Sequence, residues 1–192
     1  MYYIGIDLGT SAVKLLLMEE DGTIKKIVNR EYPIAFPHPG WSEQNPYDWY
    51  EKSMDGLKEL IANCDRSKVA GISFGGQMHG LVALDETDAV IRPAILWNDS
   101  RTEEECNYLN EVISKKALSK YTANISFTGF TAPKVLWMKN KEPENFARIH
   151  KIMLPKDYLC YRLSGVHATD VSDASGTLFF DVKNRGWSKE MC

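Results

Sequence analysis

Five polar or flexible residues near the start of the chain have the types and spacing of an anion-binding loop. An apolar segment ends in the carboxylate of Asp7, and Gly9, Thr10 and Ser11 follow, with Lys14 three residues further on. A glycine turn lets backbone N–H groups approach an anion, while hydroxyls, a lysine and a carboxylate suit a metal-bound polyphosphate. The alternative is an ordinary hairpin turn with exposed polar residues. We favour phosphate binding because strand, turn, second strand and lysine occur together.

A second candidate is the segment 75–80, Gly-Gly-Gln-Met-His-Gly, which follows an apolar strand at 69–74. Its glycines do not have the G-x-G-x-x-G spacing of a dinucleotide site, and no G-x-x-x-x-G-K-[ST] loop occurs in the chain. What remains is an open polar turn that can present Gln77 and His79 to a small hydroxylated ligand. A lone histidine is more often structural, so the residues alone leave both interpretations open.

Two further polar segments have structural alternatives. In the segment 97–101, Asn98 or Asp99 can cap a helix whose first turn is acidic at 103–105, and capping does not exclude ligand contact. The small polar residues of 169–177 can form a hydrogen-bonded turn or face a ligand. For this second segment we favour the structural interpretation.

Composition restricts the class of protein. The 192 residues have a net charge of -3, with 44% hydrophobic and 26% charged residues, which is typical of a globular protein with its own core. The chain has no block of Lys and Arg of the kind that would predict nucleic-acid binding. No apolar run is long enough for a membrane span or a signal peptide, so we expect a cytoplasmic protein. The four cysteines (Cys64, Cys106, Cys160, Cys192) lack metal-ligand spacing and are expected to be reduced thiols.

The elements that would position these residues can be read from the apolar pattern. Strands at 2–7, 13–17 and 24–32 are expected to form an antiparallel meander, with a turn at Asp21-Gly22. Val13, Leu15 and Leu17 are expected on one face of the second strand. Asn45-Pro46 begins a helix whose buried stripe is expected at Tyr50, Met54, Leu57 and Ile61.

Strands and helices alternate beyond residue 69. Strands are expected at 69–74, 81–84, 94–97, 151–154 and 178–182. Helices are expected from residue 131 and over 155–163, the second of them ended by Gly165. Another helix is marked by the apolar residues Cys106, Leu109, Val112 and Ile113. A capped helix starting at Ser188 and interrupted at Cys192 suggests a truncated protein.

Six segments, in order along essentially the whole chain, together resemble the FGGY family of carbohydrate kinases and, within it, the xylulokinase branch. Any one of them alone would be weak evidence. They are Ile4 to Ser11, Pro39 to Gln44, Gly75 to Gly80, Leu96 to Asp99, Phe130 to Lys134 and Leu154 to Tyr158.

This resemblance implies an α/β fold, an RNase H-like (actin-like ATPase) domain whose mixed sheet opens with the meander and is flanked by helices. Residues 1–192 would be the N-terminal kinase domain, ending before its natural end and without the C-terminal domain. ATP and Mg²⁺ are the implied cofactors. Asp7 would lie beside the metal, and Gly9, Thr10, Ser11 and Lys14 would bind the phosphates.

The resemblance also implies a sugar site. Met78 and His79 occupy the position of the xylulokinase sugar-binding pair, where glycerol kinases carry Arg and Glu, and this favours phosphorylation of D-xylulose to xylulose 5-phosphate. The further implied sugar-pocket residues are Gln77, Asn98, Asp99 and Asn124. The general base of the family lies in a later Gly-Asp-Asn segment that this chain does not contain, so we expect the isolated chain to be inactive.

Two alternatives stay open. The substrate can be another ketopentose or a polyol, because pocket shape is not readable from the sequence. A non-catalytic actin-like ATPase module would share the opening strands and turn. Small molecules are the expected partners, and a homodimer is left open.

Overall fold

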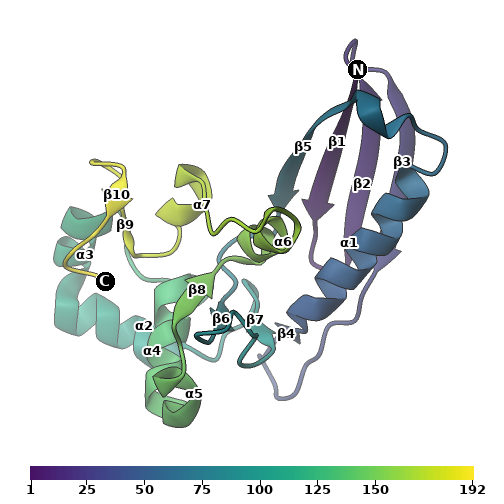
Figure 1. The fold of residues 1–192 in the computed structure, drawn as a ribbon. Coiled ribbons are helices and arrows are strands. Elements are labelled where there is room, and N and C mark those ends of the chain that lie inside the picture. Colours follow the sequence, from purple (N-terminus) through teal and green to yellow (C-terminus); the bar gives the residue numbers. More distant parts are fainter.

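A four-stranded mixed sheet forms the first part of the molecule (Figure 1). The computed structural model describes residues 1–192. The strand order is β3-β2-β1-β5, with the bounds Tyr2–Leu8 (β1), Ala12–Glu19 (β2), Ile24–Glu31 (β3) and Val69–Gly76 (β5). β1, β2 and β3 are antiparallel, and β5 runs parallel to β1. The predicted meander and mixed sheet are confirmed.

One face of this sheet is buried beneath helix α1 (Pro46–Leu60). Because side chains alternate along a strand, Val13, Leu15 and Leu17 all point to this face, as predicted, and each is at most 5% exposed. The helix begins as expected, since the side chain of Asn45 accepts a hydrogen bond from the backbone N–H of Tyr47.

The predicted buried stripe of α1 is wrong by one position. Tyr50, Met54, Leu57 and Ile61 are only half-buried. A Cβ atom at Gly56 would lie 2.5 Å from Cδ1 of Leu15, so the helix can approach the sheet only through small residues. Glycine and serine carry no apolar signal, which is why the pattern missed this face; its buried residues are Pro46, Trp49, Ser53, Gly56 and Leu60.

The second part of the molecule is built from short elements around helix α4. Its strands pair in twos: β4 (Glu43–Gln44) with β7 (Ala94–Ile95), and β6 (Val82–Leu84) with β8 (Lys151–Met153). The helices of this part are α2 (Glu103–Tyr108), α3 (Lys115–Thr122), α4 (Thr131–Lys141), α5 (Pro143–Ala147), α6 (Pro155–Ser164) and α7 (Val171–Ser175). In the first part, a single 3₁₀ turn, η1 (Arg66–Lys68), precedes β5. A separate core holds this part together and consists of Leu81, Ala83, Ile95, Trp137 and Met138.

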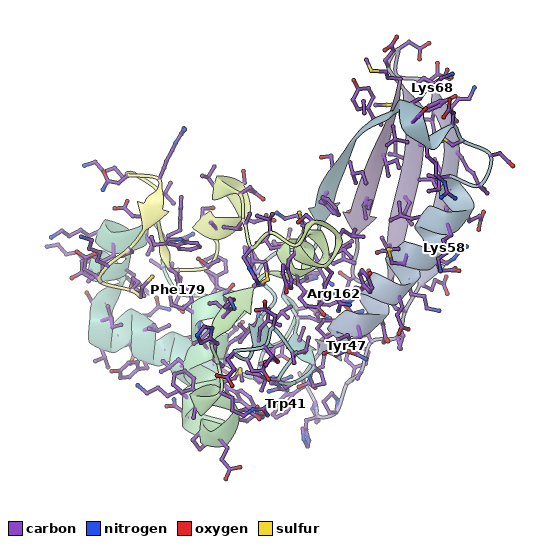
Figure 2. The ribbon with its side chains drawn as sticks, viewed as in Figure 1. Trp41, Tyr47, Lys58, Lys68, Arg162 and Phe179 are labelled. Atoms are coloured by element: carbon purple, nitrogen blue, oxygen red, sulfur yellow. The ribbon has the colours of Figure 1, made fainter.

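Helix α6 joins the two parts. Tyr158 and Leu159 belong to the same core as Trp49 of α1. Arg162 lies over the ring of Tyr50 at 4.1 Å, and Figure 2 shows it close to Tyr47 at this junction. The helix ends, as predicted, at Gly165, which has a φ of 75°.

Two expectations for the second part are wrong. The helix marked by Cys106 and Leu109 is interrupted by a π-helical turn, η2 (Leu109–Ser114), so Val112 turns outward and is 67% exposed. The N-cap of α2 is Thr102, whereas Asn98 or Asp99 was expected.

The end of the chain also differs from expectation. A hairpin of β9 (Phe180–Asp181) and β10 (Gly186–Trp187) precedes Ser188, and only a single turn follows where a helix was expected. All four cysteines are free thiols, as predicted. None of the helices combines the length and the apolar character that crossing a membrane requires.

Candidate functional site

The turn between β1 and β2, the candidate anion-binding loop, is tight and carries charged residues on its flanking strands. Asp7 and Lys14 are directly opposite in the ladder, and both are exposed on the sheet face away from α1. The N–H of Gly9 donates to the carbonyl of Ala12 at 3.0 Å and closes the turn. A Cβ atom at Gly9 would lie 3.0 Å from that carbonyl, so glycine keeps this turn tight.

Three side chains hold this loop from behind. Nε2 of Gln44 donates to the carbonyl of Thr10 at 2.6 Å, and the indole N–H of Trp97 donates to Oγ1 of Thr10 at 3.1 Å. The hydroxyl of Tyr32 donates to the carbonyl of Gly9. Burial, together with the nearby charge of Asp7, raises the pKa of Tyr32, so this hydroxyl keeps its proton at neutral pH. The loop is therefore preorganised by partners remote in sequence.

Gln77 lies behind the loop rather than on the exposed surface. Its Nε2 donates to Oε1 of Gln44 at 3.1 Å, and the same oxygen accepts from the indole N–H of Trp49. The backbone N–H of Gln77 donates to the carbonyl of Leu8 at 2.7 Å. Gln77 thus couples the turn that follows β5 to the turn that follows β1.

The glycines of the second candidate segment bring these two strands together. Gly75 is the ladder partner of Asp7, and a Cβ atom at Gly76 would lie 2.8 Å from Cβ of Leu8. β1 and β5 are parallel, so their carboxyl ends meet at one edge of the sheet. In open α/β sheets this edge is where ligands bind, and the structure brings Asp7 and the 77–79 turn to it.

The ring of His79 packs against Phe130 and Gly176, which together form the His79 slot. The backbone of His79 is left-handed, with a φ of 64°, and the ring packs on Phe130 with 4.7 Å between centroids. On the other side is Gly176, where a Cβ atom would lie 2.2 Å from Cε1 and 2.5 Å from Nδ1. Burial, reinforced by the charge of Lys134, lowers the pKa of His79, so the imidazole is neutral at pH 7. The neighbouring Met78 is 41% exposed.

A fully buried lysine lies beneath His79. Nζ of Lys134 donates to the carbonyl of His79 at 3.0 Å and to the carbonyl of Gly129, and Oγ1 of Thr131 donates to the same His79 carbonyl at 3.2 Å. Burial lowers the pKa of Lys134 to about 7, against the raising effect of Asp99. Sequence reasoning placed Lys134 in a family segment but gave it no role, because a lysine in a helix pattern normally indicates an exposed face.

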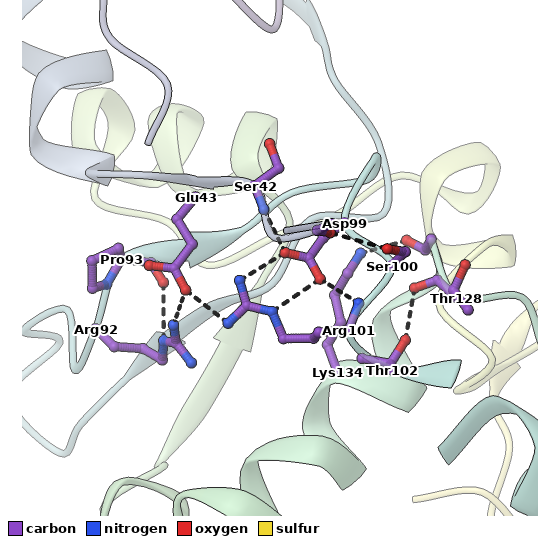
Figure 3. A network of polar contacts seen from close by, with 12 residues as sticks. Ser42, Glu43, Arg92, Pro93, Asp99, Ser100, Arg101, Thr102, Thr128 and Lys134 are labelled. Carbon is purple, nitrogen blue, oxygen red and sulfur yellow. Dashed lines mark hydrogen bonds and ion pairs between the residues drawn. The ribbon is translucent and has the colours of Figure 1, made fainter. Parts of the chain in front are cut away.

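Asp99 is enclosed in an ion-pair network (Figure 3). Its carboxylate accepts from Nε and Nη2 of Arg101 at 2.9 and 2.7 Å and from the N–H of Ser42 at 2.6 Å. Arg101 also pairs with Glu43 at 2.7 Å and stacks over Trp41 at 3.7 Å. These contacts of the Asp99 carboxylate with Ser42 and Arg101 fix the loop before α2.

The other implied residues, Asn98 and Asn124, form no hydrogen bond with the 77–79 turn. Asn98 is exposed and lines a shallow cavity of about 520 Å³ with residues 36–42. Oδ1 of Asn124 accepts from the N–H of Ile125 at 3.3 Å, beyond the end of α3. The 169–177 segment forms α7, capped by Asp170, which supports the structural interpretation, but its last turn also supplies Gly176 to the His79 slot.

A metal ion would have to share its ligands with a nucleotide here. No group of three or more His, Cys, Asp or Glu side chains is arranged to hold an ion. Mg²⁺ commonly uses one or two carboxylates together with phosphate oxygens and water. The exposed carboxylate of Asp7 beside a tight glycine turn fits that mode of binding.

The comparisons with known proteins agree with this architecture. Residues 2–192 match the model of the FGGY family of carbohydrate kinases, N-terminal domain. A xylulose kinase from Staphylococcus xylosus is 45% identical over 190 residues, which is 99% of this chain and 39% of the relative. The crystal structure of a "xyloylose kinase" from Brucella ovis superposes with a TM-score of 0.93 at 43% identity, covering 100% of this chain and 40% of that one.

A gluconate kinase from Lactobacillus acidophilus also has a TM-score of 0.93, at 28% identity, with coverage of 99% of this chain and 38% of that one. The fold and the family match define an RNase H-like sugar-kinase domain. The chain belongs to the FGGY family of carbohydrate kinases. It spans about two fifths of the length of the curated relatives that it matches.

Proposed function

We propose that the kinase whose N-terminal part is this chain transfers the γ-phosphoryl group of ATP to D-xylulose, yielding xylulose 5-phosphate in the cytoplasm. The observation that carries this proposal is the position of Met78 and His79, which follow β5 directly beside the phosphate-type loop after β1. Support also comes from the relatives that are 45% identical and named xylulose kinases.

The loop of residues 7–14 is proposed to hold the phosphate groups. Phosphoryl transfer depends mainly on positioning and charge neutralisation. Lys14 offsets phosphate charge, the backbone N–H groups around Gly9 and the hydroxyls of Thr10 and Ser11 face the phosphates, and Asp7 orients the metal. Bound Mg²⁺ supplies further neutralisation of the phosphate charge.

The 77–79 turn is proposed to hold the sugar. Because Nδ1 of His79 lies against Gly176, Nε2 is the nitrogen left to bond a sugar hydroxyl. A neutral imidazole can do so as donor or acceptor. Met78 supplies an apolar wall, and Asn98 lies at the rim. Gln77 supports the loop from behind, and Asp99 holds the neighbouring backbone. For Asn124 no contact in the structure favours a role in the sugar site.

The proton of the reacting hydroxyl is proposed to leave through a base outside residues 1–192. We therefore expect purified 1–192 protein to show no sugar-dependent ATP turnover. General-base catalysis typically contributes ~10²–10⁴-fold, and the nucleotide contacts of a second domain would be missing as well.

A second candidate is a kinase for another sugar. The observation that favours it is the likeness to a gluconate kinase, because a protein named for a different substrate has a closely similar backbone. Coupled assays of the complete kinase with D-xylulose, D-ribulose, gluconate and glycerol separate the two. We expect the highest kcat/KM with D-xylulose; a higher value with any of the others would refute the proposal.

A further inference from the structure

Lys134 is a buried amine without an assigned task. Its side chain is 0% exposed, so it cannot reach a ligand in the way a surface lysine does. Burying an amine is unfavourable unless its donors are satisfied. Here Nζ contacts two carbonyl oxygens, those of His79 and Gly129, which belong to segments fifty residues apart.

The two carbonyls belong to two loops that meet at the sugar side of the molecule. His79 lies in the turn after β5, and Gly129 precedes Phe130, whose ring forms one wall of the His79 slot. Gly129 is itself packed closely, since a Cβ atom there would lie 2.7 Å from the carbonyl of Trp97. Nζ of Lys134 therefore fixes both the backbone of His79 and the loop that carries Phe130.

The backbone at His79 needs such support. A φ of 64° is uncommon for a residue other than glycine, and such conformations persist when the surroundings over-determine them. The carbonyl of His79 accepts from two side chains of α4, Lys134 and Thr131, and this fixes the peptide group that sets the direction of the imidazole.

We infer that Lys134 is a positioning residue for sugar binding: by donating to the carbonyls of His79 and Gly129, it holds the left-handed 77–80 turn against the Phe130 loop and thereby aims His79 at the substrate. This inference rests on the proposed function of His79. It assigns no contact between Lys134 and the sugar.

The test is a double-mutant cycle in the complete kinase with Lys134→Met and His79→Asn. Methionine keeps much of the volume of lysine but donates no hydrogen bond, and asparagine tolerates the left-handed backbone but is too short to replace the imidazole. We expect Lys134→Met to lower kcat/KM for D-xylulose roughly 5- to 100-fold, mainly through KM for the sugar, with KM for ATP unchanged. In the His79→Asn background the same substitution should cost less than about 3-fold.

The matched control is Lys139→Met on the exposed face of the same helix, which should behave as wild type. Equal losses from Lys134→Met with and without His79 would overturn the inference, as would a Lys134→Met enzyme with wild-type kcat/KM. If Lys134→Met does not accumulate as folded protein, Thr131→Val removes the other donor to the same carbonyl and is judged by the same two outcomes. A His79→Asn enzyme with undiminished kcat/KM for the sugar would instead refute the role proposed for His79, and the inference with it.

Discussion

The imidazole of His79 lies against the backbone of Gly176, so closely that a methyl group on Gly176 would be 2.2 Å from Cε1 of the ring. Ninety-seven residues separate the two in the chain. The contact explains why a glycine stands at the end of α7, where its φ of -86° is accessible to any residue. Glycine is needed at position 176 because the imidazole occupies the space of a side chain, not because the backbone conformation requires glycine.

Gly176→Ala should therefore displace the His79 ring without straining its own backbone. We expect KM for D-xylulose to rise at least several-fold while KM for ATP changes little, because only the sugar side is disturbed. Gly186→Ala is the control, since a Cβ atom at Gly186 would meet nothing within 4 Å. Steady-state kinetics on both variants of the complete kinase would decide; equal sugar KM values for the two would show that the contact does not matter.

Asp7→Asn should reduce turnover and leave folding intact. Asp7 is exposed, and its substitution by asparagine keeps the shape while removing the charge that is proposed to orient the metal. We expect kcat to fall at least about 100-fold, the scale of losing one preorganised electrostatic contact. Glu51→Gln, an exposed change on α1, is the control. Normal turnover with normal Mg²⁺ dependence in Asp7→Asn would refute the assignment.

Arg101→Met should destabilise the protein strongly. The Arg101 side chain is 1% exposed and neutralises Asp99 and Glu43, so its removal leaves Asp99 buried without its guanidinium partner and leaves Glu43 paired with Arg92 alone. Breaking such a buried pair typically costs about 3–5 kcal/mol. Arg30→Met, which removes a surface pairing with Asp55 and Glu59, should have a much smaller effect on the thermal midpoint. Similar midpoints for the two variants would contradict the structural role of Asp99.

The stability contributed by Lys134 should depend on pH. Its pKa is about 7 when folded and near 10.5 when unfolded, so between these values the folded state binds fewer protons and stability rises with pH. Asp99, Arg101 and His79 are the charged or titratable groups around it. From pH 7 to pH 9, wild type should gain roughly 2 kcal/mol relative to Lys134→Met. Thermal midpoints of the two proteins that move in parallel over this range would argue against the low pKa.

Local sequence signals predicted the parts of the fold that depend on alternation and caps. The meander, the Asn45 cap and the Gly165 end follow from neighbouring residues. The buried face of α1 did not, because Ser53 and Gly56 are buried for close approach rather than for hydrophobicity. The π-helical turn that exposes Val112 has no recognisable sequence signal.

The candidate site divides in the same way. Asp7, Gly9 and Lys14 are close in sequence, and the structure keeps them close in space. The walls of the His79 slot, Phe130 and Gly176, come from distant segments, and such contacts are visible only once the chain has folded. The enclosed state of Asp99 depends on the backbone N–H of Ser42 and on Arg101, which also pairs with Glu43, and neither contact was predicted from the sequence.

The central claim is that His79 bonds the sugar beside the phosphate loop, and kinetics of His79→Asn in the complete kinase test it most directly. If Nε2 bonds a hydroxyl, its loss costs ~1–3 kcal/mol, or roughly 5- to 150-fold in kcat/KM for D-xylulose. Affinity for ATP without sugar and the thermal midpoint should change little. A fall in the midpoint with kcat/KM per folded molecule unchanged would mean that His79 is a structural residue and that the sugar is bound elsewhere.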